Sequence, residues 1–172
     1  HRQYGDDVEY ADFIDDFSAA DWNPDEWADL FADVGANYVV LTGEHHDGFP
    51  LWETHYTKHN ALNADRGDLV GDLSDAVRDR DLRFAASYHA NLNYYQPGYE
   101  GRFGHPYFQG GEIGDEDAGP GPEYVDFMNA KHRELIRKYE PDLLWFDVPM
   151  ADADHLNAKD LIADYYNTAE DW

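Results

Sequence analysis

Short apolar runs alternate with longer amphipathic stretches along most of the chain, and this alternation limits the folds that it can adopt. Apolar runs of strand length occur at 37–43, 82–89 and 142–148. Each run is flanked by segments whose apolar residues recur every three or four positions, as they do on one face of a helix. Repeated units of this kind indicate a parallel sheet with right-handed crossovers. The sequence therefore predicts a single α/β domain over residues 1–172.

The helical segments carry recognisable start signals. Asn23 is a favourable N-cap and Pro24 a favourable first helical residue. Asp68 is interpreted as the cap of the next helix, which begins at Leu69. Further helices are expected over about 122–139 and 156–169. Four apolar residues fall on one face of the first helix: Trp27, Leu30, Phe31 and Val34.

Charge excludes several classes of partner. The chain has 37 Asp and Glu against 12 Lys and Arg, which gives a formal net charge of −25. Nucleic acids and anionic membrane surfaces require clustered cations, so neither is expected as a partner. An aromatic content of 16% argues against a disordered acidic segment. A densely acidic surface is typical of a protein that works in high salt, where self-repulsion is screened.

The absence of certain residue types and motifs from the sequence excludes several further kinds of site. The chain has no cysteine, which excludes disulfides and thiolate sites. No apolar run approaches the roughly 18 residues of a membrane span. No glycine-rich turn follows the first strand to hold a dinucleotide. A doubly wound sheet and part of a (β/α)8 barrel both fit the element order, although a whole barrel needs about 250 residues.

In both architectures the functional site lies at the carboxyl ends of the strands. Polar groups gather there: Glu44 and the histidines after it, Tyr88 and His89, and Asp147. A carboxylate such as Asp147 at the end of a buried strand is costly unless it is used or paired. It could instead cap a helix or form a salt bridge. Trp145 points to the same side of its strand, where an indole suits the wall of a sugar site or ordinary core packing.

The stretch GEHHDGFPLW, which begins at Gly43, concentrates the chemistry. His45, His46 and Asp47 could form a metal site with help from elsewhere, but their spacing is not a known chelate. Hydrogen bonding of the two histidines to sugar hydroxyls is the favoured interpretation, and a buried, backbone-satisfied histidine is the alternative. The glycine turn then brings Phe49 and Trp52 back over the pocket.

Three segments together resemble the α-L-fucosidases of glycoside hydrolase family 29. They are NYVVLTGEHHDGFPLW, RGDLVGDLSDAVRDRDLRFAASYH and ELIRKYEPDLLWFD, in this order. The resemblance covers roughly residues 10–150. It implies a partial TIM-like (β/α)8 barrel, with this chain supplying about the second to fourth strands and their helices.

The resemblance also implies a retaining, exo-acting α-L-fucosidase that hydrolyses terminal α-L-fucosyl linkages of oligosaccharides or glycosides. Asp147 matches the nucleophile, which forms a covalent fucosyl intermediate. No metal or other cofactor is implied. The residues that match sugar-contacting positions are His45, His46, Tyr88 and Trp145, with Phe49 and Trp52 beside the methyl group of fucose.

Two positions depart from the family pattern, which usually has Lys in place of Glu44 and Gly in place of Val148. The general acid/base is expected outside this chain, as is the first barrel strand. We therefore expect an incomplete barrel that is poorly stable alone, or self-associates, and completes its site with the remainder of the barrel. The alternative function is a non-catalytic or degenerate carbohydrate-binding relative that lacks the acid/base.

Overall fold

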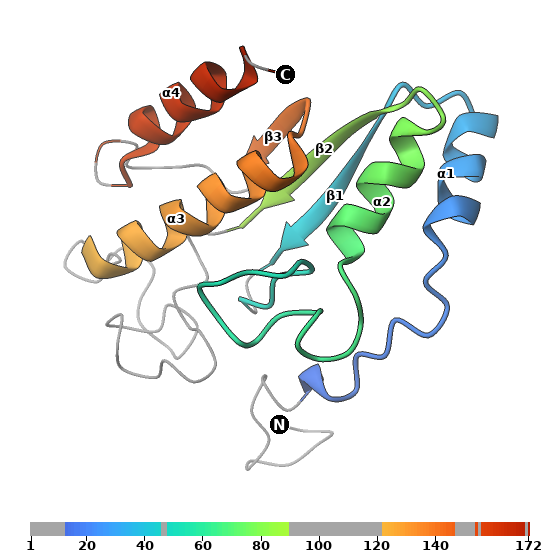
Figure 1. Ribbon diagram of the computed structural model, residues 1–172, viewed down its shortest axis with the longest axis horizontal. Coiled ribbons are helices and arrows are strands. Elements are labelled where there is room, and N and C mark those ends of the chain that lie inside the picture. Colours follow the sequence, from blue (N-terminus) through green and yellow to red (C-terminus); the bar gives the residue numbers. More distant parts are fainter. Residues whose placement is uncertain (1–12, 46–47, 90–121, 147–153, 155, 171) are drawn as a thin grey trace, which may run out of the picture.

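The computed structural model describes residues 13–45, 48–89, 122–146, 154, 156–170 and 172. Helices and strands alternate along the chain, as the sequence predicts (Figure 1). The elements are α1 (Pro24–Asp33), β1 (Tyr38–Glu44), α2 (Leu69–Arg78), β2 (Arg83–Tyr88), α3 (Pro122–Tyr139), β3 (Leu143–Phe146) and α4 (Ala158–Ala169). The prediction of an α/β fold is confirmed.

Both predicted caps are present. The Asn23 side chain accepts a hydrogen bond from the backbone N–H of Glu26 at 3.2 Å, and Pro24 occupies the first turn of α1. The Asp68 side chain accepts one from the N–H of Gly71 at 3.1 Å. Each cap satisfies a backbone donor that would otherwise be unpaired at the start of its helix.

The described strands form a parallel sheet in the order β1-β2-β3. Glu44 at the end of β1 pairs with Tyr88 at the end of β2. Tyr88 in turn pairs with Phe146 at the end of β3. The carboxyl ends of the strands are therefore level, so the residues that follow them leave the same edge of the sheet.

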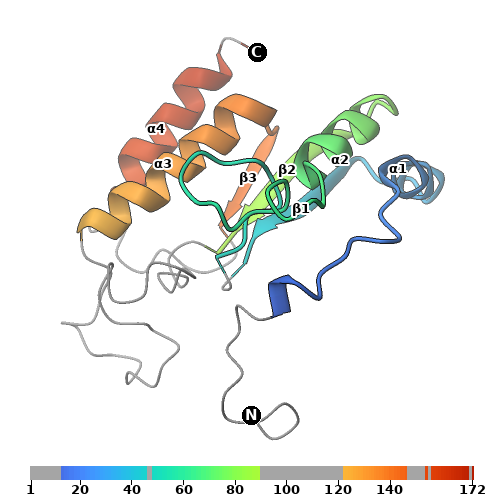
Figure 2. The same ribbon diagram turned by 60° about the horizontal axis from the view of Figure 1, so that its bottom comes forward.

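All four helices lie in one layer on one face of this sheet, with α1 beside α2 and α4 beside α3 (Figure 1, Figure 2). The core lies between the two layers, where Leu41 and Phe84 of the sheet pack with Leu73 and Leu135 of the helices. A doubly wound sheet carries helices on both faces, and this arrangement differs from it. On the opposite face, four large side chains of β1 and β3 are exposed: Tyr38, Val40, Leu143 and Trp145.

The apolar face expected on α1 is present but largely uncovered. Trp27, Leu30 and Val34 are 43%, 58% and 72% exposed, and Ala28 is the buried residue of this helix. Arg80, which follows α2, holds α1 beside α2 through ion pairs with Asp25 and Asp29 of α1. Spacing thus predicts correctly which residues share a face, whereas the described residues leave most of that face exposed.

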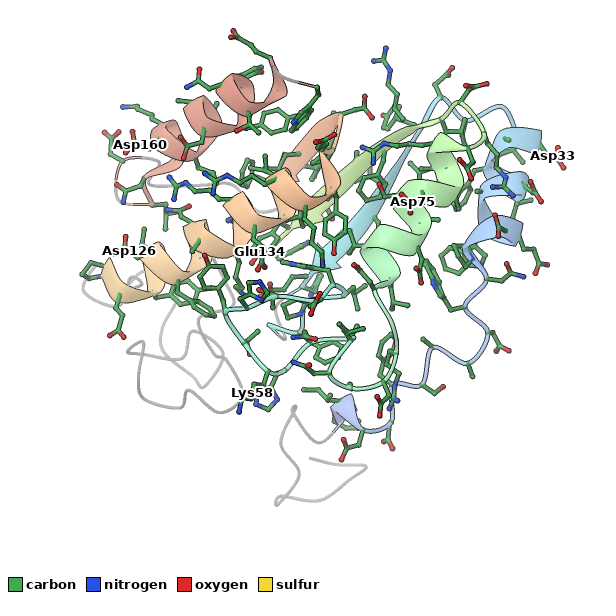
Figure 3. All side chains as sticks on the ribbon, in the orientation of Figure 1. Asp33, Lys58, Asp75, Asp126, Glu134 and Asp160 are labelled. Carbon is green, nitrogen blue, oxygen red and sulfur yellow. The ribbon has the colours of Figure 1, made fainter. Side chains whose placement is uncertain are left out.

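Acidic side chains are exposed on every helix. Exposed examples labelled in Figure 3 are Asp33 on α1, Asp75 on α2, Asp126 on α3 and Asp160 on α4. The negative charge is therefore spread over the helical surface and is not confined to one patch. No helix among the described residues is long and apolar enough to cross a membrane.

Candidate functional site

A β-bulge at the end of β1 sets the geometry of the site. The pairing of β1 with β2 shifts between Thr42 and Glu44, which leaves Gly43 as an extra residue. A Cβ on Gly43 would lie 3.3 Å from Leu135 Cδ1 of α3, so this residue faces the helices. Glu44 faces them too, because a bulge turns the next side chain to the same side. His45 then lies on the open face of the sheet, which is the face that carries no helices.

His45 meets a second histidine there. The ring of His89, the first residue after β2, lies with its centroid 4.0 Å from that of His45, the two planes inclined by 36°. The backbone N–H of His89 donates to the carbonyl oxygen of Glu44 at 3.3 Å. Sequence reasoning placed His89 among the polar groups at the strand ends but assigned it no contact with a ligand.

A cavity of about 320 Å³ opens beside His45, within the range of roughly 300–1,000 Å³ typical of small-molecule sites. His45, Thr42 and Glu44 are the polar residues of its lining, and the rest of the lining is apolar. The apolar lining residues are Phe13, Ile14, Phe17, Phe49 and Leu51. Phe49, predicted to border a pocket, is thus part of this wall. A site of this composition suits a ligand with hydroxyl groups on one side and an apolar group on the other.

Behind the cavity lies a buried polar cluster. Glu44 and Lys131 of α3 are each 1% exposed, with Lys131 Nζ 2.5 Å from Glu44 Oε1. The Tyr88 hydroxyl donates to Glu44 Oε2 at 2.8 Å. Lys131 Nζ also lies 4.6 Å from the centroid of the Phe127 ring. Pairing and hydrogen bonding make the burial of both charges tolerable. Burial and the neighbouring Glu44 carboxylate raise the pKa of Tyr88 well above its usual range.

His132 of α3 packs against this cluster. Its ring centroid is 3.8 Å from that of Tyr88, and its Nδ1 is 3.1 Å from the carbonyl oxygen of Met128. Because a carbonyl only accepts, Nδ1 carries the hydrogen. Burial, reinforced by the charge of Lys131, lowers the pKa of His132 to about 3, so the ring is neutral at ordinary pH. No described residue bonds its Nε2.

Trp52 and Tyr88, both predicted to contact ligand, are buried on the helix side of the sheet. The Trp52 indole N–H donates to Glu134 Oε2 at 3.2 Å, and the other oxygen of Glu134 accepts the backbone N–H of His55 at 3.0 Å. The loop after β1 is therefore anchored to α3. Trp145 behaves differently: it is 51% exposed and lies on the open face of the sheet.

Asp147, His46 and Asp47 lie outside the described residues. The last position described on β3 is Phe146, at the carboxyl edge of the sheet. Within the part of the chain that the structure describes, no group of three His, Asp or Glu residues could hold a metal ion.

The fold and the site define a parallel α/β protein with a small-molecule cavity at the carboxyl edge of its sheet. A family model described as alpha-L-fucosidase matches residues 1–172. The chain belongs to the α-L-fucosidase family, and the resemblance to glycoside hydrolase family 29 is confirmed.

Individual relatives agree with this assignment. Tissue alpha-L-fucosidase of Bos taurus is 37% identical over 96% of this chain and 34% of that protein. Alpha-L-fucosidase of Dictyostelium discoideum is 30% identical over 85% of this chain and 30% of that protein. The crystal structure of Thermotoga maritima alpha-fucosidase in complex with fucose superposes with a TM-score of 0.78, at 39% identity, over 98% of this chain and 39% of that chain. The chain thus spans about a third of the length of these curated relatives.

Proposed function

We propose that these residues form part of the active site of a retaining, exo-acting α-L-fucosidase acting on terminal α-L-fucosyl groups of oligosaccharides or glycosides. The observation that carries the proposal is the level carboxyl edge of the sheet in a chain of this family. At that edge His45 borders a cavity, and β3 is described as far as Phe146, the residue before Asp147 in the sequence. The related Thermotoga maritima alpha-fucosidase crystallised in complex with fucose, which supports the substrate class.

In the proposed reaction, a carboxylate oxygen of Asp147 attacks the anomeric carbon of fucose as the bond from that carbon to the leaving oxygen breaks. A second carboxyl group, which is not assigned among these residues, gives its proton to the leaving oxygen. Water, deprotonated by the same second group, then attacks the anomeric carbon of the fucosyl ester and releases Asp147. Two inversions at one carbon give net retention.

The side of the sheet on which His45 and Trp145 lie supports their part in the proposed sugar contacts. We propose that His45 and His46 hydrogen-bond fucose hydroxyls, that Trp145 packs against the ring, and that Phe49 contacts the methyl group. Fucose is uncharged, so uncharged donors and an apolar wall suit it. Contact of the sugar with Tyr88 and Trp52 stays a prediction. Their burial favours a supporting position one layer beneath His45 and Phe49.

We further propose that additional strands close the sheet into a (β/α)8 barrel. Two features support this: the helices occupy one face of the sheet, and large side chains such as Tyr38 and Leu143 are exposed on the other. In a barrel that exposed face becomes the packed interior. Where those strands are missing, the exposed face and the outer edges of β1 and β3 favour self-association.

The experiment replaces Asp147 by Asn in the protein, expressed with any coding sequence that flanks these residues. Release of p-nitrophenol from p-nitrophenyl α-L-fucoside should fall by more than about a thousandfold while L-fucose still binds. Asp75→Asn, on the exposed surface of α2 (Figure 3), is the matched control and should keep full activity. Turnover that survives Asp147→Asn would refute the assigned nucleophile.

The same assay separates the alternatives. An unmodified protein that binds L-fucose without turnover would be the non-catalytic carbohydrate binder. Turnover that is lost with a chelator and restored by a divalent metal would favour the hydrolase built on His45, His46 and Asp47.

A further inference from the structure

Glu44 takes no part in the proposed chemistry, yet it is among the most buried side chains that the structure describes. Its two carboxylate oxygens have separate partners, Lys131 Nζ at 2.5 Å and the Tyr88 hydroxyl at 2.8 Å. These partners come from α3 and β2, so Glu44 joins three elements at one point. A buried ion pair is a costly way to gain stability, because apolar side chains of similar volume serve as well or better. What the ion pair does supply is orientation: it holds the Glu44 side chain in the one geometry that brings both of its oxygens to their partners.

The face toward which the Glu44 side chain points determines the face toward which the His45 side chain points. Along a strand, successive side chains alternate between faces, so the residue after Glu44 must point away from the helices. The bulge at Gly43 is what places Glu44 on the helix side. The backbone carbonyl of Glu44 also accepts the N–H of His89, which ties the start of the His45 loop to β2.

We propose that Glu44 and Lys131 are positioning residues that lock the bulge, so that the His45 ring stays against His89 and in the lining of the cavity. The proposal rests on the proposed function, because it assigns the pair the task of orienting a sugar-binding histidine. A loosened bulge would let His45 rotate out of the cavity while the core beneath remained packed.

A kinetic double-mutant cycle tests this role in the same expressed protein. Glu44→Gln should lower kcat/KM for p-nitrophenyl α-L-fucoside by about tenfold, mainly through a higher KM. In a His45→Ala background the same change should cost less than about twofold, because the residue that Glu44 orients is already gone. The charge exchange Glu44→Lys with Lys131→Glu should recover most of the loss.

The matched control is Glu53→Gln. Glu53 belongs to a surface ion pair, with Lys138 Nζ at 3.6 Å, and its loss should leave kcat/KM unchanged. The Glu44→Gln variant could fail to fold because of the charge left on the buried Lys131. In that case the double variant Glu44→Gln with Lys131→Met replaces it. That variant has no unpaired buried charge and should show the same dependence on His45. An equal loss of kcat/KM with and without His45 would show a merely structural role and overturn the proposal.

A measurement without substrate separates this proposal from the proposed function. The rings of His45 and His89 lie close enough to shift each other's proton resonances. In protein labelled at histidine, Glu44→Gln should move both sets of resonances, and Glu53→Gln should move neither. Moved resonances in a protein without fucosidase activity would support the locking of His45 and refute the fucosidase. If the resonances of His45 and His89 do not move, the proposal that Glu44 holds the His45 ring in place is overturned, whether or not the protein is active.

Discussion

The buried His132 should make the protein acid-sensitive by an amount that can be worked out. In the folded protein its pKa is lowered to about 3, whereas an unfolded histidine titrates near about 6.5. Between these values the unfolded chain binds a proton that the folded chain does not, so the free energy of unfolding falls as pH falls. The contribution is fully present above about pH 6.5 and is lost progressively down to about pH 3.

The loss in the free energy of unfolding depends on how far the pH lies below the pKa of histidine in the unfolded chain. Each pH unit in this window costs about 1.4 kcal/mol. A change from about pH 7.5 to about pH 5 should therefore remove about 2 kcal/mol of stability through His132 alone. His132→Gln removes the titrating ring and keeps a group that can donate a hydrogen bond to the carbonyl of Met128.

The assay is urea unfolding at both pH values and at constant salt. Most of the acidic groups titrate alike in all variants, so the useful quantity is the difference in pH dependence between variant and parent. His132→Gln should lose about 2 kcal/mol less than the parent over this interval. His55→Gln, on an exposed side chain, should lose as much as the parent. Equal losses in parent and His132→Gln would refute the reasoning, because His132 would then be protonated or solvated in the folded state.

Two further predictions concern packing and charge. Gly43→Ala should lower the free energy of unfolding by about 1–3 kcal/mol. The added Cβ would lie 3.3 Å from Leu135 Cδ1 and 3.5 Å from Trp52 Cζ3, so the neighbouring side chains would have to shift. A urea midpoint equal to that of the parent would contradict this prediction. With a net charge of −25, the melting temperature should rise by more than about 5 °C between about 0.1 M and about 2 M sodium chloride, because salt screens the repulsion. A flat or falling melting temperature in calorimetry would rule out adaptation to high salt.

Local signals predicted the elements well. The Asn23 and Asp68 caps began their helices where the side-chain chemistry required, and the three apolar runs became strands. These features depend on neighbours within a few residues, so one sequence contains the information. The clustering of polar groups at the strand ends was also predictable, because parallel strands end at a common edge.

The remainder depended on contacts across the fold. The bulge at Gly43 follows from pairing with β2 and packing against Leu135, neither of which is visible within β1. Lys131 and His132 lie on the buried face of α3, on the stripe that includes Met128 and Leu135. Polar residues on such a stripe were the available signal for a buried cluster. Their partner, Glu44, lies 87 positions from Lys131 and could not be read from spacing.

The bulge also makes the end of β1 sensitive to length in a way that composition does not reveal. Because Gly43 is the extra residue of the bulge, removing it alone would restore plain alternation and keep Glu44 toward the helices and His45 toward the cavity. Removing Thr42 and Gly43 together would instead exchange the two environments, placing an imidazole beneath the sheet and a carboxylate at the cavity. A one-residue deletion at Gly43 should therefore be tolerated during divergence better than a two-residue deletion, the reverse of what holds in a regular strand.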